Sequence, residues 1–513
     1  MIGILFQYFC SPDLMLICIG LGISAGLMYL SYYKIKGMSF YRILFGASVF
    51  ASFTFLGSIT ADIHHVKMVD ADSVVGNRFC AVVTLQPEEK PKSWKSQLMV
   101  LDSCGNEAFE MLAYFQKDSL NPPPQMGDLI ALNINIKPIK NNNSSPTDFD
   151  YAGYMAKQGV YYQSYVNSQN YSILQSGYKK GIRYYGCKIR EKLIGVYRRF
   201  DFDEKQLAVL EALTLGYKSD LDEDTKSAFQ SSGAMHVLAV SGLHTGIIML
   251  ITDALLKFLN RTRKEKIIKC AIVLSVIWLF AAVTGFSSSV NRAALMFSIM
   301  SIGNATGRNS TTYNSLALSC FILLFINPYL IFNVGFGLSY LAVLSIVSFN
   351  PLFQRIELTV KNPILKYFWG IVLVSIAAQI GTSVLSISTF GQFPMYFLLT
   401  NIIVIPVAYV IMMLAVVLLI SNYIYWLGYA VFWLLKQALS FLVWSVTWIE
   451  SLPGSCMRDI ALDNTTAILI YLMIASLTVF IYYKKFVWIK VAAASILIIS
   501  LLSTYENICL AFF

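Results

Sequence analysis

Long apolar blocks recur along most of the chain, and only one region near the N-terminus departs from this pattern. With ~20 residues per crossing, the blocks predict roughly ten to twelve membrane segments. Gly, Pro or Asn interrupts several blocks, so some segments are expected to be broken or re-entrant. The candidate segments are 14–33, 40–60, 234–256, 267–284, 292–303, 313–326, 331–349, 367–389, 395–420, 426–449, 466–482 and 486–504.

The region that departs from this pattern lies at residues 61–175. It contains short runs of β-branched and aromatic residues bounded by turn residues, which predict strands. Five short strands favour an OB-like barrel, a fold whose open face often carries single-stranded nucleic acid. A generic β-barrel or sandwich fits the pattern equally well. The candidate strands are 79–86, 94–102, 109–115, 128–137 and 160–166.

Composition decides the class of protein. Hydrophobic residues make up 56% of the chain and charged residues 13%, with a mean hydropathy of +0.60. These values exclude an ordinary soluble globular protein and predict a polytopic α-helical membrane protein with an OB-like β domain inserted after the second span. The expected domains are an N-terminal transmembrane helix pair at 1–60, the β domain at 61–175, a basic amphipathic and helical connector at 176–232, and a multi-spanning domain at 233–513.

Basic residues in the short loops predict the orientation of the spans. Lys34, Lys36 and Arg42 place the first connection in the cytoplasm, and the basic stretch 257–269 returns the chain to that side. The β domain between them is therefore expected on the far, periplasmic side of the membrane.

Residues 233–250, GAMHVLAVSGLHTGIIML, place His236, Ser241 and His244 within an apolar run. A polar side chain at membrane depth needs a partner or a water-filled cavity, so this group is a candidate functional site. In one continuous helix the two histidines lie about 80° apart around the axis and border one cavity. Alternatively, Ser241-Gly242 breaks the helix, as in transporters. A third interpretation is that these polar side chains only form hydrogen bonds between neighbouring helices.

The segment 178–199 mixes basic and aromatic residues, with Glu191 as its single acidic residue. Such a mixture suits a phosphate backbone with stackable bases, and it equally suits a helix lying on an anionic membrane surface. Its candidate guiding residues are Lys179, Lys180, Arg183, Lys188, Arg190, Arg198 and Arg199.

The nine cysteines do not pair at the short spacing of a zinc site, and we expect neither a metal nor another cofactor. Cys80 and Cys104 lie on neighbouring candidate strands of the exported domain. They are either a disulfide, which that oxidising compartment permits, or two free thiols.

Several ordered segments resemble the ComEC family, the inner-membrane channel proteins of bacterial natural transformation. The longest is ALTLGYKSDLDEDTKSAFQSSGAMHVLAVSGLHTGII at 212–248, followed by TGFSSSVNRAALM at 284–296 and NVGFGLSYLAVLSI at 333–346. AAQIGT at 377–382 and FPMYFLLTNIIVIPV at 393–407 are similar to later family elements. FDYAGYMAKQGV at 149–160 and the order of paired spans and β domain match as well, so the resemblance covers nearly the whole chain.

The resemblance implies a channel, not an enzyme, that passes single-stranded DNA into the cytoplasm through the bacterial inner membrane. Expected partners are single-stranded DNA, membrane lipid, a separate DNA receptor and a cytoplasmic translocase; a separate nuclease and a second copy of the chain stay open. A polyanion needs a wet path with a polar or weakly positive lining. The expected pathway residues are His236, Ser241, Gly242, His244, Gly285, Ser289, Arg292, Asn333, Gln379 and Asn401.

The chain departs from the family pattern in two places. Asn333 stands where relatives usually have Asp, and Gly337 where they usually have Gln. Many relatives also carry a C-terminal metallo-β-lactamase-like domain. His244 is the last histidine of this chain, so a His-rich two-metal centre cannot be built from the residues after it. We expect the form without that domain.

Two other functions remain as alternatives. One is an intramembrane hydrolase, with Ser241 as nucleophile and His236 or His244 as base, although no acidic residue lies nearby in the sequence to orient the imidazole. The other is an exporter of a small molecule or glycan, for which internal hydropathy symmetry between the halves would be the sign.

Overall fold

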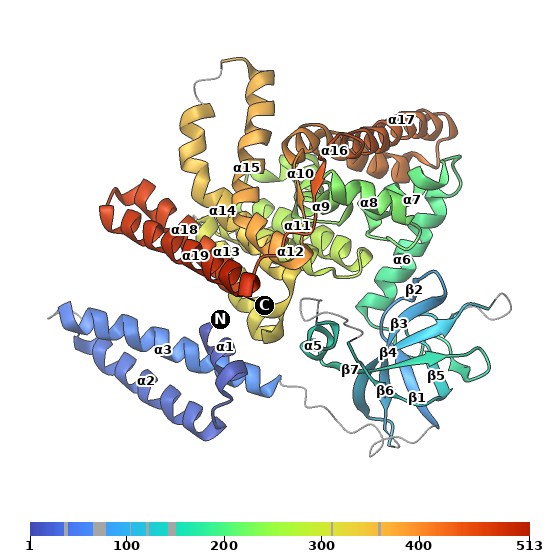
Figure 1. Ribbon diagram of the computed structural model, residues 1–513. Coiled ribbons are helices and arrows are strands. Elements are labelled where there is room, and N and C mark those ends of the chain that lie inside the picture. Colours follow the sequence, from blue (N-terminus) through green and yellow to red (C-terminus); the bar gives the residue numbers. More distant parts are fainter. Residues whose placement is uncertain are drawn as a thin grey trace. The chain divides into compact units, whose positions relative to one another are not determined.

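The structure is a computed structural model that describes residues 1–34, 39–64, 78–102, 104–118, 123–141, 150–308, 311–357 and 361–512 (Figure 1). Lys36 lies outside the described residues. Unit 1 comprises Met1–Cys187 and Leu318–Asn333, and unit 2 comprises Lys188–Ala317 and Val334–Phe513. The helices α6 (Ile182–Tyr197) and α13 (Thr312–Ile326) cross this division.

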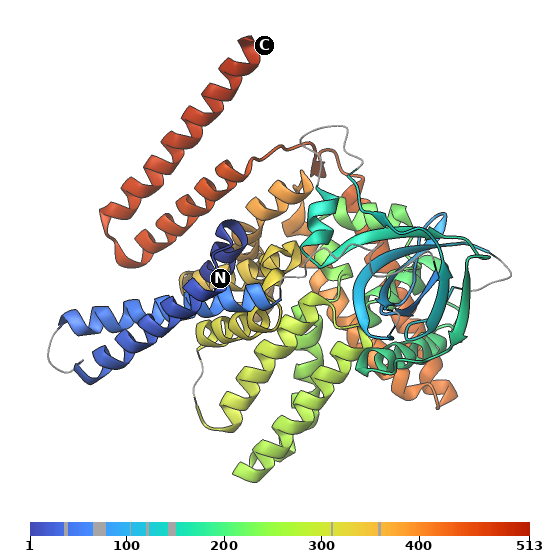
Figure 2. The same ribbon diagram turned by 90° about the horizontal axis from the view of Figure 1, so that it is seen from below.

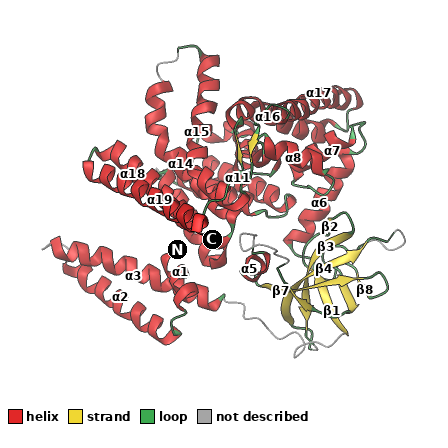
Figure 3. Ribbon diagram, in the orientation of Figure 1, coloured by secondary structure: helices red, strands yellow, loops and turns green. Residues whose placement is uncertain are grey.

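Unit 1 contains the predicted β domain, and Figure 3 shows its strands gathered in one sheet. Strands pair in the order β6, β7, β4, β3, β1, β5, β8, and β2 adds to β3. The pair β4–β7 is parallel, whereas the other pairs are antiparallel. The bounds are β1 Arg78–Val83, β2 Glu88–Glu89, β3 Ser93–Leu101, β4 Glu107–Gln116, β5 Leu129–Asn133, β6 Lys137–Pro138, β7 Val160–Val166 and β8 Tyr171–Gln175.

The sheet curves into a barrel (Figure 2). Strand β5 pairs with β1, and β6, which follows it after three residues, pairs with β7. The chain segment that contains β5 and β6 therefore joins β1 to β7, which are the two ends of the path β1-β3-β4-β7. Alternate residues face inward, as the period of a strand requires, so that Val100, Met111, Phe115 and Ile130 are fully buried. The five predicted strands all form, although the strand predicted at 128–137 ends at Asn133, and β2, β6 and β8 are additional.

Helices complete unit 1. α2 (Leu14–Lys34) and α3 (Ser39–Ile63) pack as a hairpin, which matches the predicted pair of spans. The short α1 (Ile2–Cys10) was not predicted; it packs on α3, where the Ser58 hydroxyl donates to the Gly3 carbonyl at 2.8 Å. The remaining elements are α5 (Tyr151–Ala156) and the 3-10 helix η2 (Pro328–Phe332).

Unit 2 is built almost entirely of helices. Sequence signals define several ends: Asp203 and Gln206 form a capping box before α7, Thr262 and Glu265 form one before α11, and Pro363 begins α15. The bounds are α7 Glu204–Leu215, α8 Glu223–Ser231, α9 Met235–Leu238, α10 Gly242–Leu255, η1 Lys257–Asn260, α11 Arg263–Val283, α12 Ser288–Ala305, α14 Val334–Glu357, α15 Pro363–Phe390, α16 Phe397–Ser421, α17 Tyr425–Glu450, α18 Asn464–Tyr483 and α19 Phe486–Phe512.

The largest hydrophobic core of unit 2 packs the short helix α7 against α16 and α17, which are long and apolar enough to cross a membrane. Leu210 and Leu213 of α7 are fully buried with Leu238 of α9, Ile411 of α16 and Leu439 of α17. Where the helices lie in lipid, close van der Waals packing of such side chains holds them together. A short antiparallel pair, β9 (Phe393–Pro394) with β10 (Cys456–Met457), ties the start of α16 to the end of α17.

The predicted spans correspond to helices at every position. Among the described residues, eight helices are long and apolar enough to cross a membrane, and three shorter apolar helices accompany them. The candidate segment 234–256 differs from the others, because it is two helices instead of one.

Candidate functional site

The segment that carries both histidines is broken in the middle. Helix α9 is a single turn that ends at Leu238, and Ala239 leaves it in an extended conformation with φ −83° and ψ 116°. Helix α10 begins at Gly242, after Ser241 as its N-cap. The continuous helix considered from the sequence is therefore wrong, and the break expected at Ser241-Gly242 is present.

Ser241 and His244 form a reciprocal cap on α10. The Ser241 amide donates to His244 Nδ1 at 3.2 Å, and the Leu243 amide donates to Ser241 Oγ at 3.3 Å. His244 takes the place that Glu or Gln usually occupies in a capping box. Because Nδ1 accepts, the neutral imidazole carries its proton on Nε2. That atom is buried and has no hydrogen-bond partner among the described residues.

The same geometry bears on the hydrolase alternative. Ser241 Oγ lies 3.2 Å from His244 Nδ1, close enough for a nucleophile and base. Yet Nδ1 already accepts the Ser241 amide, and no ion pair between His244 and a carboxylate occurs in the described part of the chain. The pair is accounted for as a helix cap.

His236 lies on the other side of the break. Its side chain is exposed on the surface of unit 2, and Nδ1 lies 3.0 Å from the Gly233 carbonyl in the turn before α9. The two histidines thus occupy different surroundings, one exposed and one enclosed.

A strained turn joins α11 to α12. Gly285 has φ 77° and Phe286 has φ 55°, in the left-handed region that glycine tolerates and a bulky residue does not. The Phe286 amide donates to the Ala281 carbonyl at 2.7 Å, and Asn291 Nδ2 donates to the Phe286 carbonyl at 2.9 Å, which holds the turn in place. Ser289 follows in the first turn of α12 and is half-buried.

Arg292 projects from α12 into the interior and is only 5% exposed. Its Nη1 donates to Ser288 Oγ at 2.7 Å, and its guanidinium carbon lies 5.8 Å from the centre of the Phe336 ring. Nε has no hydrogen-bond partner in the part of the chain that the structure describes. No carboxylate among the described residues forms an ion pair with Arg292, and a buried cation of this kind is costly, so Arg292 is a candidate site residue.

Asn401 and Gln379 lie on neighbouring helices, α16 and α15. The Asn401 amide donates to Ser375 Oγ at 3.0 Å, while its Oδ1 is buried and finds no donor among the described groups. Gln379 is half-buried, one turn of α15 beyond Ser375.

The helices that carry these polar residues pack together, because α10 contacts both α12 and α16, and α16 contacts α15. A methyl group built on Gly242 would lie 3.6 Å from Cβ of Ala293, the neighbour of Arg292. His244, Arg292 and Asn401 each bury a polar atom that no described residue satisfies. Since buried polar groups are normally hydrogen-bonded, these three unpaired atoms make α10, α12 and α16 the candidate site.

Asn333 does not belong to this group of helices. It caps η2 at the end of unit 1, whereas the other nine expected pathway residues lie in unit 2.

Some basic side chains of the segment 178–199 contact other residues, whereas others are exposed and form no ion pair among the described residues. Arg190 is 8% exposed and lies over the Tyr217 ring at 5.8 Å. Arg198 donates to Asp220 at 2.7 Å, and Lys188 and Lys179 pair with Glu191 and Glu107. The exposed residues for which no pair occurs among the described residues are Lys180, Arg183 and Arg199. The prediction that all seven residues guide the strand therefore differs from the structure, because only three of the seven are exposed without an ion pair among the described residues.

Cys80 and Cys104 are both free thiols in the structure, the first half-buried in β1 and the second exposed in the turn after β3. The described residues also contain no group of three or more His, Cys, Asp or Glu that could hold a metal ion.

Sequence reasoning missed two further polar groups in unit 2. Glu211 is completely buried in α7 beside Arg198. Lys226 of α8 and Arg458 line a common hollow next to the turn before α9. A lone basic residue in the loop 451–463, between two apolar helices, was the only sequence signal for Arg458.

Comparison with known proteins now adds the family. The model of the family described as Competence protein matches residues 213–487, more than half of the chain. The chain belongs to the competence protein (ComEC) family. The family match contains the broken helix, the strained turn and the Arg292, Gln379 and Asn401 positions.

A curated relative is similar over about half of the chain. "ComE operon protein 3" of Bacillus subtilis (strain 168) is 26% identical over 266 residues, which are 52% of this competence protein and 32% of the relative. The chain thus spans about a third of the length of that relative. No solved structure matches the chain.

Proposed function

We propose that this chain is the inner-membrane channel through which single-stranded DNA enters the cytoplasm during natural transformation. Membership of the competence family supports the setting. The observation that carries the proposal is the group of buried, incompletely satisfied polar atoms on α10, α12 and α16. A path for a polyanion needs polar or weakly positive groups, and these helices supply such groups.

The charge of this lining also suits a polyanion. Arg292 supplies a buried cation, and α10 carries its acidic residue at the far end, where Asp253 pairs with Lys269 at 2.7 Å. His244 Nε2 and Arg292 Nε are donors, which can be offered to phosphate or water.

The break between α9 and α10 supports a pathway at this place. Irregular backbone at membrane depth occurs where it lines a cavity or is buried in protein. The resemblance and the loop charges favour an outer position for the start of this segment, so we place the entrance at His236 and the turn before it.

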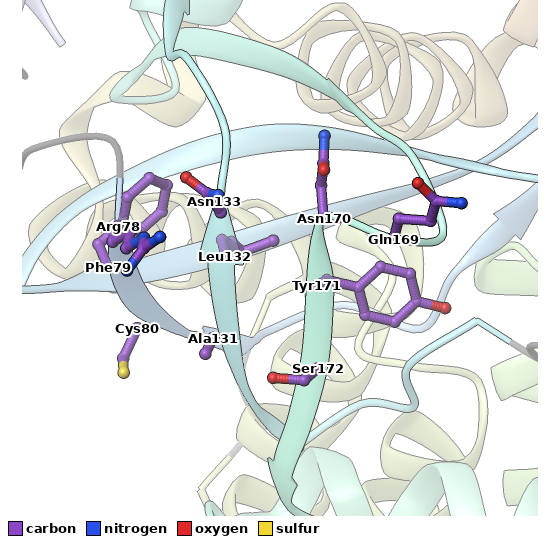
Figure 4. Close-up of a pocket in the computed structure, with 10 residues that line it drawn as sticks. All are labelled: Arg78, Phe79, Cys80, Ala131, Leu132, Asn133, Gln169, Asn170, Tyr171 and Ser172. Atoms are coloured by element: carbon purple, nitrogen blue, oxygen red, sulfur yellow. The ribbon is translucent and has the colours of Figure 1, made fainter.

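The β domain is proposed as an exported, OB-like receiver of the strand. Its closed path of strands with one parallel pair supports the OB-like assignment. A hollow of about 360 Å³ lies across β1, β5 and β8, and Figure 4 shows a cation, an aromatic ring and amides around it. Arg78, Asn133, Asn170 and Tyr171 provide these groups, which suit phosphate and base contacts.

The exposed part of the basic segment is proposed to guide the strand. Lys180, Arg183 and Arg199 are exposed cations, and each phosphate they neutralise makes binding dependent on salt. A DNA receptor and a cytoplasmic translocase are the proposed partners.

Uptake of labelled DNA tests the channel. Deletion of the gene should stop labelled DNA from reaching the cytoplasm, and His236→Ala or His244→Ala should abolish transformation at a normal level of protein in the membrane. His244→Gln separates the two roles of His244, because Gln preserves a capping box. Loss of uptake in this variant too indicates that the imidazole itself is needed.

Normal uptake in the deletion strain would contradict the channel. Normal uptake in both alanine variants would remove the histidines from the pathway while leaving the channel in place. The hydrolase alternative predicts instead that Ser241→Ala abolishes activity while His236→Ala does not.

A further inference from the structure

A polar hollow of about 280 Å³ opens beside the turn that precedes α9. Helix α8 forms one wall, and the residues around the strand pair β9–β10 form the other. We call it the Arg458 pocket. Its lining includes Glu223, Lys226, Gln230, Ser231, Gln392 and Arg458.

The wall that carries Arg458 is fixed on both sides. The Met395 amide donates to the Ser455 carbonyl at 2.9 Å, and the Ile460 amide donates to the Gly391 carbonyl at 2.9 Å. Arg458 is held between these two bonds, next to Asp459 with φ 60°. A binding group on a rigid element loses little entropy when it binds.

Contacts also connect the pocket to the turn 231–233, which leads to the proposed entrance at His236. Thr400 Oγ1 donates to the Ser232 carbonyl at 2.7 Å, and a methyl group built on Gly233 would lie 3.0 Å from Pro394 of β9. The turn 231–233, which leads into α9, therefore forms the boundary between the pocket and His236.

The charges of the pocket suit one monovalent anion. Lys226 pairs with Glu223 at 2.8 Å, so these two charges offset each other. The Arg458 guanidinium donates to the neutral Ser231 hydroxyl at 3.3 Å, and no carboxylate pairs with it among the described residues. One net positive charge remains, together with hydroxyl and amide groups, which are the usual companions of Arg at a phosphate.

We propose that the Arg458 pocket binds a phosphodiester group and holds it directly before the entrance to α9–α10. This inference rests on the proposed channel, because the phosphodiester is assigned to the entering strand. A lipid head group offers the same chemistry, and the experiment separates the two sources.

The test uses the full chain in nanodiscs of zwitterionic lipid and a short fluorescent single-stranded oligodeoxynucleotide. Arg458→Gln should weaken binding about tenfold, the typical effect of losing one charge-assisted hydrogen bond. The slope of log affinity against log salt should fall by about 0.7 for each lost phosphate contact. Lys226→Gln should act in the same direction.

The matched control is Lys205→Gln. Lys205 is an exposed cation of α7, 3.7 Å from Asp222, and it lies outside the pocket. This variant removes the same charge and should leave the salt slope unchanged. A second arm uses native mass spectrometry to count phosphatidylglycerol retained by wild type and Arg458→Gln.

The outcomes are distinct. A lower affinity and slope in Arg458→Gln alone, not in the control, supports the strand as occupant. Unchanged oligodeoxynucleotide binding with lost phosphatidylglycerol overturns the strand and assigns the phosphodiester to lipid. No change in either arm overturns the pocket. Uptake in the gene deletion is scored separately, so a failed pocket with uptake still dependent on the gene leaves the channel standing.

Discussion

At the scale of single residues, Glu211 is the most unusual group outside the spans. Its side chain is 0% exposed, with Oε1 3.4 Å from Arg198 Nε and Oε2 without a partner among the described residues. Burial raises the pKa of this carboxyl to about 7, although the nearby Arg198 lowers it. Burial outweighs the ion pair because Arg198 is half exposed and also donates to Asp220.

This gives a prediction for stability against pH. Between pH 4.5 and about 7 the folded protein binds more protons at Glu211 than the unfolded chain, so stability falls as pH rises through that range. Glu211→Gln, which stays neutral, should flatten this fall and raise the melting temperature above wild type at pH 8. Thermal unfolding of detergent-solubilised protein across a pH series measures it.

Glu204→Gln is the control, since Glu204 is exposed on the same helix. A pH profile that is identical in Glu211→Gln and wild type would contradict the buried carboxyl.

At the scale of elements, two glycines of the family-like segments have different reasons to be there. Gly285 lies at φ 77° in the α11–α12 turn, and a methyl group on it would approach Arg190 Nη1 to 3.4 Å. Gly242 begins a regular helix, and a methyl group there makes only an ordinary contact at 3.6 Å. Backbone conformation explains the first glycine, and close helix packing explains the second.

Gly285→Ala should therefore destabilise the protein by about 1–2 kcal/mol, the cost of a left-handed residue with a side chain. Gly242→Ala should change stability by less, since alanine favours the helix. Melting temperature and the level of protein in the membrane measure both variants. Equal destabilisation by the two substitutions would refute the assignment of the turn.

Helix positions and strand alternation were predictable because they depend on local hydrophobic period. The sequence allowed either a continuous helix or a break at Ser241. The break was not certain because the capping box has His244 at the position where Glu or Gln is usual. The buried state of Arg190 was not predictable, because it depends on Tyr217 and on the turn at Gly285, both distant in sequence. The grouping of His244 with Arg292 and Asn401 likewise requires the tertiary contacts of α10.

At the scale of the whole molecule, the orientation in the membrane follows from loop charge alone and has a direct test. Cys104, exposed in the β domain, is expected outside, and Lys264, exposed at the start of α11, is expected in the cytoplasm. In two single-cysteine variants, one retaining only Cys104 and one carrying only Lys264→Cys, an impermeant maleimide should label Cys104 in spheroplasts and Lys264→Cys only after permeabilisation. The reverse pattern would invert the proposed topology.

The small sheet β9–β10 has a consequence for how the molecule is made. Its strands precede α16 and follow α17, so the sheet can pair only after both helices have been inserted and turned. Such closure of a long loop is a late event in assembly. The wall that holds Arg458 is thus completed only after α16 and α17 are in place.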